Sequence, residues 1–474
     1  MQTHRCDSLL LIIFCCLAAL PGLAVYPNAP ITDITLYADV QATNLYRLTN
    51  GVYRHDFWAP GPASPAKPHW LAARIHSKHD RITVTLDAPD AGSISSIGDS
   101  SFNSYRIEVS DNSTDGRDGT WQPVVTNAAN PFVAMGHVIP FAGRSWVKIV
   151  FTGANSWPNT GLEELHLYDS SLEADDSWYV IGDSITYYGY SWVGRGGLVG
   201  DMPVACYYPG QVHARDARYT PAMYAVGFPG SASSGLWNGG WRDGVFDSFP
   251  CARYVCLAFG MNDCWQMAGT NEYMQCVQSM IDRIKQHGQV PILFRTIQPT
   301  DSPEHDRRVQ QFNQALAALE AKNHLTPGPD YYAAFTNAGG KFSADGVHPN
   351  SAGVQAMHAC WAQTMLSNVY SGAWVGSLRI SNATARVVAK RGGQWQISAQ
   401  ADVACVAGTV TNVMLDARAL GAGTVPMNGA GATRSATFTT KKMRVPYGEY
   451  IVIAVSADNG DRSSVTLPTP IPEG

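Results

Sequence analysis

The chain has 474 residues, of which 45% are hydrophobic, and its 33 basic and 38 acidic residues give a formal net charge of −5. This length predicts about three globular domains. No basic tail or stripe is present, which argues against nucleic acid as a partner.

The first 24 residues have the pattern of an export signal. A positively charged start, Met1–Arg5, precedes a short apolar core at Leu9–Leu20, and small residues surround an expected cleavage point after Ala24. The apolar core is too short to span a membrane comfortably, and no later segment offers a span. We therefore expect a secreted protein, extracellular or periplasmic, without an integral membrane span. A retained N-terminal anchor is the alternative.

Seven cysteines follow this segment: Cys206, Cys251, Cys256, Cys264, Cys276, Cys360 and Cys405. An exported protein can form disulfides, but an odd number leaves at least one cysteine unpaired within a monomer. None of the seven lies in a C-x-x-C pair or near a histidine at zinc-finger spacing, so we expect no metal site.

Residues 25–172 have the rhythm of an all-β domain. Short alternating runs such as RITVTLDAP and RSWVKIVFTG are separated by clusters of Asn, Asp, Gly and Pro. Three features occur in the order seen in discoidin-like (galactose-binding-like) β-sandwich domains, which this segment resembles. They are a Y-x-I-x-x-S strand at Tyr105–Ser110, a Gly-rich turn with a tryptophan at Gly119–Trp121, and a closing strand at Leu162–Tyr168.

Residues 175–370 change character, because strand-like runs alternate with long helical patterns. The alternation predicts an α/β fold, in which a parallel sheet is covered by helices on both faces. The expected later strands are Ala252–Gly260, Val290–Ile297 and Tyr331–Phe335. The expected helices are Asn271–His287 and Glu304–Asn323.

From residue 375 to residue 474 the helical periodicity disappears again. Runs such as QWQISAQADVACV and GEYIVIAVSADNG read as strands, and DNGDRS supplies a hairpin turn. This segment resembles bacterial immunoglobulin-like modules, which implies a second small β-sandwich.

The first strand of the α/β region carries the first candidate for chemistry. The apolar run Trp178–Ile181 stops at Gly182-Asp183-Ser184, which places Ser184 at the carboxyl edge of the sheet. Serine is a poor nucleophile by itself, so it needs a base that takes its proton and a group that orients the base. We expect Asp183 to be a hydrogen-bond acceptor that fixes the loop.

A suitable base lies late in the same region, in the stretch FSADGVHPNSAG. Asp345 and His348 are three residues apart on a Gly-containing turn, so one short loop can present a carboxylate and an imidazole together. The carboxylate can accept the Nδ1 proton, which leaves Nε2 free to act as base. Two alternatives for Asp345 stay open: a cap of the turn, or a bystander to a Ser-His dyad.

An acyl-transfer site also needs donors for the developing oxyanion. Asn262 in GMND follows the expected strand Ala252–Gly260, and its amide is available at the strand end. Gly230 in AVGFPGSASSG follows another apolar run, and its backbone N–H can approach a substrate because no side chain obstructs it. The backbone N–H of Ser184 is the third expected donor.

These pieces, in this order, resemble the SGNH hydrolases, also called GDSL-type esterases, over roughly residues 177–368. The resemblance implies that Ser184 is the nucleophile and that His348 and Asp345 complete a catalytic triad. It also implies that Gly230 and Asn262, with the N–H of Ser184, form the oxyanion hole.

Two observations qualify and sharpen this resemblance. An asparagine commonly precedes the glycine of the second block, but Ala225 stands at that place here, which leaves Gly227 as a rival to Gly230. The chain contains no G-x-S-x-G, so the nucleophile elbow of an α/β-hydrolase is not expected.

The expected fold is therefore an SGNH-hydrolase-like three-layer parallel sheet flanked by two all-β sandwich domains. An exported enzyme of this family joined to a discoidin-like domain resembles carbohydrate esterases. This implies a serine esterase that removes acetyl groups from an acetylated polysaccharide or oligosaccharide and needs no cofactor. Two alternatives stay open: a polysaccharide O-acetyltransferase, and a carbohydrate-binding protein whose central domain is inactive.

Overall fold

The structure is a computed structural model of the whole chain. It describes residues 25, 27–49, 57–87, 102–128, 134–154, 161–171, 176–191, 208–239, 242–247, 249–267, 269–323, 325–336, 345–371, 378–390, 394–405, 408–440, 450–458 and 462–469. The expected export signal, residues 1–24, lies outside these ranges.

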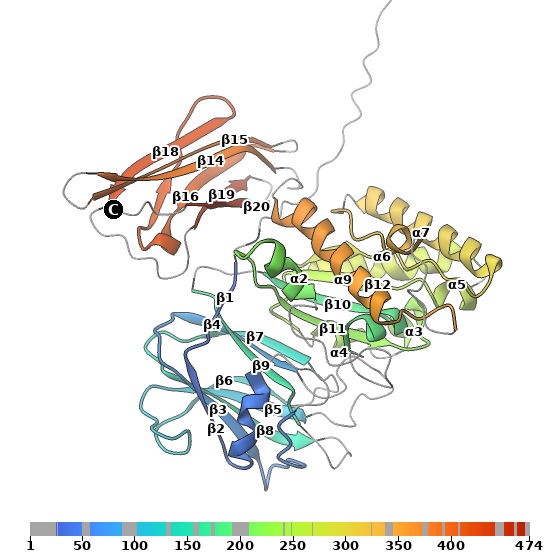
Figure 1. Cartoon of the computed structure of the whole chain (residues 1–474), viewed down its shortest axis with the longest axis horizontal. Coiled ribbons are helices and arrows are strands. Elements are labelled where there is room, and N and C mark those ends of the chain that lie inside the picture. Colours follow the sequence, from blue (N-terminus) through green and yellow to red (C-terminus); the bar gives the residue numbers. More distant parts are fainter. Residues whose placement is uncertain are drawn as a thin grey trace, which may run out of the picture.

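Two antiparallel sheets form the N-terminal part of the molecule (Figure 1). One sheet has the strand order β2-β3-β8-β5-β6 and the other β1-β9-β4-β7. The strands are β1 (Ala29–Pro30), β2 (Ile34–Ala38), β3 (His69–Ile75), β4 (Arg81–Asp87), β5 (Phe102–Ser110), β6 (Gln122–Asn127), β7 (Ala134–Pro140), β8 (Trp146–Ala154) and β9 (Glu164–Asp169). The 3-10 helix η1 (Ala42–Thr49) follows β2.

Alternating residues of these strands build one hydrophobic core between the two sheets. Val147, Ile149 and Phe151 of β8 belong to this core together with Val84 of β4 and Leu167 of β9. Because successive side chains of a strand point to opposite faces, this spacing buries one face of each sheet. The arrangement is consistent with the expected β-sandwich, whereas its likeness to discoidin domains stays a prediction.

The central part contains a parallel sheet with the strand order β11-β10-β12-β13. Its strands are β10 (Ser177–Asp183), β11 (Ala222–Phe228), β12 (Tyr254–Ala258) and β13 (Val290–Leu293). Every residue of β10 and β11 is buried. Continuous burial is typical of parallel strands that are covered on both faces. The sequence-based expectation of a parallel sheet is confirmed.

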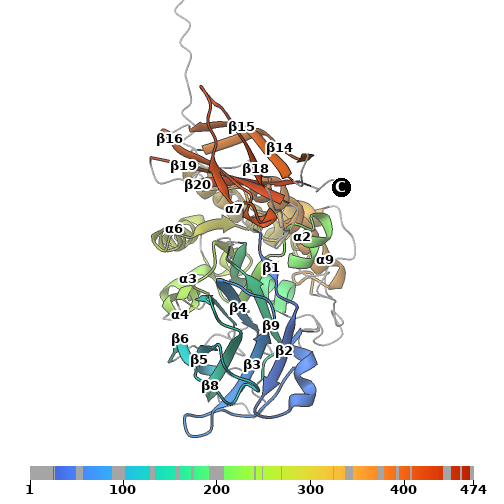
Figure 2. The ribbon, with the colours of Figure 1, turned by 90° about the vertical axis from the view of Figure 1, so that its left-hand side faces the viewer.

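Helices cover both faces of this sheet. Figure 2 shows α3, α4 and α6 on one side of it and α2 and α9 on the other. The helices are α1 (Ser184–Thr186), η2 (Tyr187–Ser191), α2 (Tyr208–Arg215), α3 (Ser233–Asn238), α4 (Arg242–Asp247), α5 (Asp263–Gln266), α6 (Thr270–Gln286), α7 (Pro303–Asn323), α8 (Tyr331–Thr336), α9 (Ser351–Met365) and η5 (Leu366–Tyr370).

One expected strand is wrong, because Tyr331–Phe335 belongs to the helix α8. The side chain of Asp330 accepts a hydrogen bond from the backbone N–H of Ala333 at 2.9 Å and so caps the first turn. Tyr331 and Phe335 are buried and lie four residues apart, which is the helical spacing. A short apolar run does not distinguish a strand from a helix by itself.

Two further antiparallel sheets form the C-terminal part, with the strand orders β14-β15-β18 and β17-β16-β19-β20. Their strands are β14 (Leu378–Lys390), β15 (Gln394–Cys405), β16 (Val410–Asp416), β17 (Thr424–Pro426), β18 (Thr433–Thr440), β19 (Tyr450–Ala457) and β20 (Arg462–Pro468), and η6 (Arg418–Leu420) follows β16. Ile397 of β15 and Ile453 of β19 share one core. The immunoglobulin-like assignment stays a prediction.

The N-terminal sheets are attached directly to the central part. The side chain of Asn28 donates hydrogen bonds to the backbone oxygens of Asp176 at 2.6 Å and Thr220 at 3.3 Å. Gly136 of β7 lies against the ring of Phe249, where a Cβ atom would come within 2.4 Å of the ring. Val25 belongs to the core of the central part, so the chain crosses this junction before β1 begins.

Six of the seven cysteines lie in the described part of the chain, and Cys251, Cys256, Cys264 and Cys276 are free thiols. The seventh, Cys206, lies outside it. Among the described residues, no helix combines the length and the apolar character needed to cross a membrane.

Candidate active site

The end of β10 positions Ser184. Gly182 is required there, because a Cβ atom would come within 2.1 Å of Thr186 Oγ1 and 2.6 Å of the Ala258 carbonyl oxygen. The side chain of Asp183 then accepts a hydrogen bond from the Ile185 N–H at 2.9 Å and caps α1. The chain therefore turns from strand to helix at Ser184, at the carboxyl edge of the sheet, as the sequence predicts.

The loop that carries Asp345 and His348 is fixed by its own backbone. Asp345 Oδ1 accepts hydrogen bonds from the N–H groups of Val347 at 2.9 Å and His348 at 3.0 Å. Gly346 has a φ of +70°, which glycine adopts without strain, and its carbonyl accepts from the Thr300 N–H at 2.7 Å. The loop is thus a tight turn held against the segment that precedes α7.

The structure brings Ser184, His348 and Asp345 together although Ser184 and His348 are 164 residues apart. His348 Nε2 lies 3.0 Å from Ser184 Oγ. On the other side of the ring, His348 Nδ1 lies 2.6 Å from Asp345 Oδ2. Both distances suit hydrogen bonds, with Nδ1–H donating to the carboxylate and Nε2 accepting from the hydroxyl.

Tyr188 also contacts this group, and the sequence argument did not identify it. Its ring stacks on the His348 ring with 4.5 Å between the centroids and 28° between the planes. Burial, and then the charge of Asp345, raise the pKa of the Tyr188 hydroxyl. The cluster of aromatic residues after Ser184 was the available signal, but the sequence does not indicate which of them faces the histidine.

The two candidate glycines lie in different surroundings. Gly227 is inside β11, where a Cβ atom would come within 2.4 Å of the Tyr187 backbone nitrogen. Gly230 lies beyond the strand, in a turn closed by a 3.0 Å hydrogen bond from the Ser231 N–H to the Phe228 carbonyl. Its φ is +77°, and nothing lies within 4 Å of the position of a Cβ atom. Gly227 therefore serves close packing, and Gly230 occupies the open loop.

Asn262 joins this open loop to the end of β12. Its side-chain nitrogen donates to the Ser231 carbonyl at 3.3 Å. Gln266, four residues after Asn262, donates from its side chain to the Gly230 carbonyl at 2.7 Å. An amide nitrogen carries two hydrogens, so Asn262 keeps a second one for another acceptor. The structure therefore brings Asn262 and the Gly230 loop together, while their role as oxyanion donors stays a prediction.

Two fully buried acids hold these loops in place through hydrogen bonds. Asp183 accepts from the Met261 N–H at 3.2 Å, next to Asn262. Asp263 accepts from both the backbone N–H at 2.8 Å and the hydroxyl at 2.5 Å of Ser233. Burial, with the charge of nearby Asp263 as a further contribution, raises the pKa of Asp183 to about 7. Burial raises the pKa of Asp263 to about 6.

These raised pKa values predict a pH-dependent stability. A buried carboxyl whose pKa is raised binds a proton more tightly in the folded than in the unfolded chain, so its contribution to stability falls as pH rises from about 4 to about 7. Asp263→Asn mimics the protonated acid. We expect the variant to gain stability relative to wild type over this range, by roughly 1–3 kcal/mol.

Urea unfolding of both proteins at several pH values measures this difference. Asp330→Asn, which neutralises the exposed acid that caps α8 and keeps an acceptor oxygen there, is the control for the loss of a carboxylate. Parallel pH curves for Asp263→Asn and wild type would contradict the expectation.

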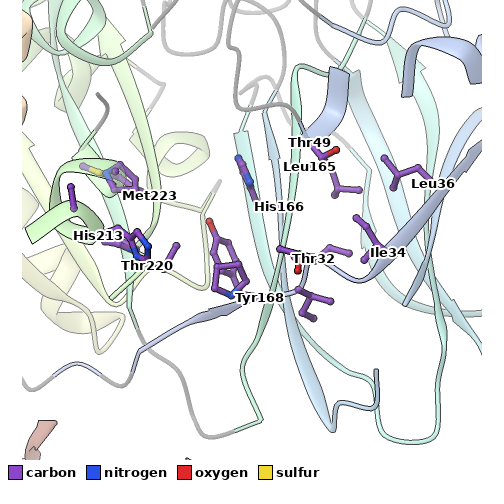
Figure 3. Close-up of a pocket in the computed structure, with 17 residues that line it drawn as sticks. Thr32, Ile34, Leu36, Thr49, Leu165, His166, Tyr168, His213, Thr220 and Met223 are labelled. Carbon is purple, nitrogen blue, oxygen red and sulfur yellow. Dashed lines mark hydrogen bonds between the residues drawn. The ribbon is translucent and has the colours of Figure 1, made fainter. Parts of the chain in front are cut away.

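A cavity of about 600 Å³ lies away from these residues, between the N-terminal sheets and the central part (Figure 3). Its lining is mainly apolar and includes Leu36, Leu165 and Met223. Met223 lies near the amino end of β11, whereas Ser184 follows the carboxyl end of the neighbouring β10. The cavity is therefore at the opposite edge of the sheet from the candidate site.

The sequence predicts no metal or cofactor. Within the described ranges, no cluster of three or more His, Cys, Asp or Glu side chains could hold a metal ion.

Comparison with solved structures finds distant similarities to proteins of 14–21% identity. Axe2, an acetylxylan esterase from Geobacillus stearothermophilus, is 19% identical, with 40% of this chain and 93% of that chain covered and a TM-score of 0.32. TesA is 18% identical, with coverages of 40% and 97% and a TM-score of 0.31. A putative lipolytic protein of the G-D-S-L family from Desulfitobacterium hafniense is 14% identical, with coverages of 40% and 99% and a TM-score of 0.31.

No curated protein matches the sequence. A family model does match it: residues 180–356 fit the GDSL-like Lipase/Acylhydrolase family. This segment runs from β10 to α9 and includes all five predicted site residues: Ser184, Gly230, Asn262, Asp345 and His348. The central part of the chain, residues 180–356, is therefore similar to GDSL-type acylhydrolase domains.

Proposed function

We propose that this protein is a secreted serine esterase that removes acetyl and other short acyl groups from O-acetylated polysaccharides or oligosaccharides. One observation carries the proposal: His348 lies between Ser184 Oγ, at 3.0 Å, and Asp345 Oδ2, at 2.6 Å. This is the arrangement of nucleophile, base and orienting acid that acyl transfer requires.

In the first half of the reaction, Ser184 Oγ attacks the ester carbonyl while His348 Nε2 takes the hydroxyl proton. The carbonyl oxygen becomes an oxyanion, which receives hydrogen bonds from the N–H groups of Ser184 and Gly230 and from the amide of Asn262. As the C–O bond to the alcohol breaks, His348 returns the proton to the leaving oxygen. The sugar alcohol departs, and the acyl group stays on Ser184.

In the second half, a water molecule replaces the alcohol. His348 takes a proton from the water as its oxygen adds to the acyl carbonyl, and the same donors hold the second oxyanion. The bond to Ser184 Oγ then breaks, Oγ takes the proton from His348, and the carboxylic acid leaves. Asp345 accepts from Nδ1–H throughout, so it holds the tautomer and stabilises the imidazolium that forms.

The proposal of a carbohydrate substrate rests on the β-sheet regions that flank the central domain. Sandwich-like sheets accompany the acylhydrolase domain on both sides, as expected for an exported enzyme that acts on polymers. Transfer of the acyl group to a sugar hydroxyl instead of water is the alternative outcome of the same chemistry.

Acetate release tests the function. Purified protein is incubated with p-nitrophenyl acetate and with acetylated xylan, mannan and pectin, and acetate is measured enzymatically, with and without an added sugar acceptor. Release from a polymer would support the carbohydrate esterase. Acetylated acceptor without free acetate would favour the transferase, and no reaction of folded protein with any ester would overturn the hydrolase.

Asn262→Ala tests the oxyanion hole. We expect kcat to fall by about 10²- to 10³-fold with a small change in KM, because the amide is used mainly in the transition state. Steady-state kinetics on p-nitrophenyl acetate measure both constants.

Gln266→Ala is the matched control, since Gln266 also bonds to the carbonyl of the Gly230 loop, at 2.7 Å. The kcat of Gln266→Ala should fall by less than about tenfold. An equal loss in both variants would assign the effect to loop position and would contradict a direct role for Asn262.

A further inference from the structure

Trp265 is unusual because its side chain is largely exposed. The residue is 53% exposed, whereas Trp58, Trp146, Trp178 and Trp361 are each less than 2% exposed. Within the described part of the chain, the other large exposed hydrophobic residues are Tyr46 and Val138. Large aromatic rings that remain in water often mark a binding surface.

Trp265 lies on α5, directly after the segment that carries Asn262 and is here called the oxyanion loop. The helix α5 begins directly after Asn262, and the Trp265 N–H donates to the Asn262 carbonyl at 3.1 Å. Residues three apart on a helical turn lie on the same face. Trp265 therefore leaves the first turn of α5 on the same face as Asn262, whose amide is proposed to bind the oxyanion.

The buried His305 and the partly exposed Asp301 support the indole on its protein side. The ring of His305 is fully buried and packs against Trp265 with 4.4 Å between the ring centroids. His305 Nδ1 donates to the carboxylate of Asp301, whose oxygens lie at 2.8 and 3.0 Å. The backbone of Asp301 in turn packs against Gly346, where a Cβ atom would come within 2.9 Å of the Asp301 nitrogen. This chain of contacts runs from the oxyanion loop to the loop of Asp345 and His348.

We infer that Trp265 is a stacking platform for a pyranose ring of the acylated substrate, with His305 and Asp301 as positioning residues. The inference rests on the proposed esterase function and names the part of the substrate beyond the ester. A sugar ring has an apolar C–H face that covers an indole and hydroxyl groups at its edge. The exposed Gln266, which follows Trp265 in the chain, is a polar residue that could serve the hydroxyl groups.

The isolation of the ring favours a sugar over an apolar partner. An acyl chain or a second protein would require a continuous apolar surface. Among the described residues, Tyr46 and Val138, the other exposed large hydrophobics, lie on η1 and β7 of the N-terminal sheets rather than on the central domain. A single ring with polar neighbours therefore fits one sugar unit.

Two acetate esters distinguish a loss of sugar-ring binding from a general loss of ester hydrolysis. Xylopyranose tetraacetate presents its acetates on a ring, whereas xylitol pentaacetate presents similar acetates on an open chain. We expect Trp265→Ala to lower kcat/KM for the ring substrate about tenfold more than for the open-chain substrate, mainly through KM. Trp265→Phe keeps an aromatic face and should recover most of this preference.

Two further variants complete the experiment. Asp301→Asn should raise KM for the ring substrate while leaving kcat nearly constant, because it acts on the orientation of the indole through His305. Tyr46→Ala removes an equally exposed aromatic ring from the N-terminal sheets and should behave like wild type on both substrates.

Several results would overturn the platform. Equal losses of Trp265→Ala on the two substrates would assign Trp265 to the structure of the oxyanion loop. If light scattering shows a dimer for wild type and a monomer for Trp265→Ala, the indole belongs to a subunit interface. If wild-type protein hydrolyses p-nitrophenyl acetate but neither polyol acetate, the sugar platform is overturned and the esterase function stands. If folded wild-type protein hydrolyses no ester, both the esterase function and the platform are overturned.

Discussion

Ser184→Ala is expected to lower kcat for acetyl ester hydrolysis by about 10⁴- to 10⁶-fold. The hydroxyl is the atom proposed to form the acyl-enzyme, and His348 Nε2 lies 3.0 Å from it with its other nitrogen already bonded to Asp345. Without Oγ, only binding and the oxyanion donors remain, and they cannot form the covalent intermediate. Hydrolysis of p-nitrophenyl acetate over long incubations measures the residual activity of the variant.

A labelling experiment accompanies this variant. A fluorophosphonate should add to wild-type protein once, at the peptide that contains Ser184, and should not add to Ser184→Ala. Ser279→Ala, which removes an exposed hydroxyl from α6, is the control and should keep full activity and labelling. Activity of Ser184→Ala within about tenfold of wild type would contradict the acyl-enzyme mechanism.

Asp345→Asn is expected to have the second-largest effect, a loss of about 10³- to 10⁴-fold in kcat. An amide cannot replace the carboxylate as a negatively charged acceptor for Nδ1–H, and it can favour the opposite tautomer of His348. The amide oxygen can still accept from the Val347 and His348 N–H groups, which the carboxylate holds at 2.9 and 3.0 Å. The loop should therefore keep its shape, and the loss should appear in kcat rather than in stability.

The outcome for Asp345→Asn decides between a triad and a dyad. The Asp345 side chain is 48% exposed, so water could replace part of its contact with His348. A loss smaller than about tenfold would favour a Ser-His dyad and leave Asp345 as the cap of its turn. Asp330→Asn, another exposed acid that caps a turn in the same domain, should change kcat by less than about twofold.

The sequence could predict which residues lie close together because parallel sheets concentrate polar residues at one edge, while their catalytic roles stay predictions. The apolar runs that end at Ser184 and near Asn262 are β10 and β12 of the sheet, and their carboxyl ends are adjacent. Asp345 and His348 could be paired from sequence because their spacing fits one turn. These inferences depend on contacts between near neighbours in the chain or on a general rule of the fold, so no coordinates were needed.

Other features required the folded chain. Nothing local distinguishes Gly227 from Gly230, because the difference is the approach of Tyr187 to Gly227 from another element. The exposed Trp265, supported by His305 from α7, and the stacking of Tyr188 on His348 also depend on residues far apart in sequence. The strand expected at Tyr331–Phe335 is the helix α8, because two aromatic residues four apart suit a buried helix face and Asp330 caps it.

The sequence by itself thus determined the order of β and α/β regions, the parallel sheet and the residue types that end its strands. Tertiary structure decided which glycine lies in the open loop, which tyrosine stacks on the histidine and which tryptophan remains in water. The physical reason is the range of the interactions involved. Periodicity and turn chemistry act between residues a few positions apart, whereas packing and exposure depend on every element that reaches the same place.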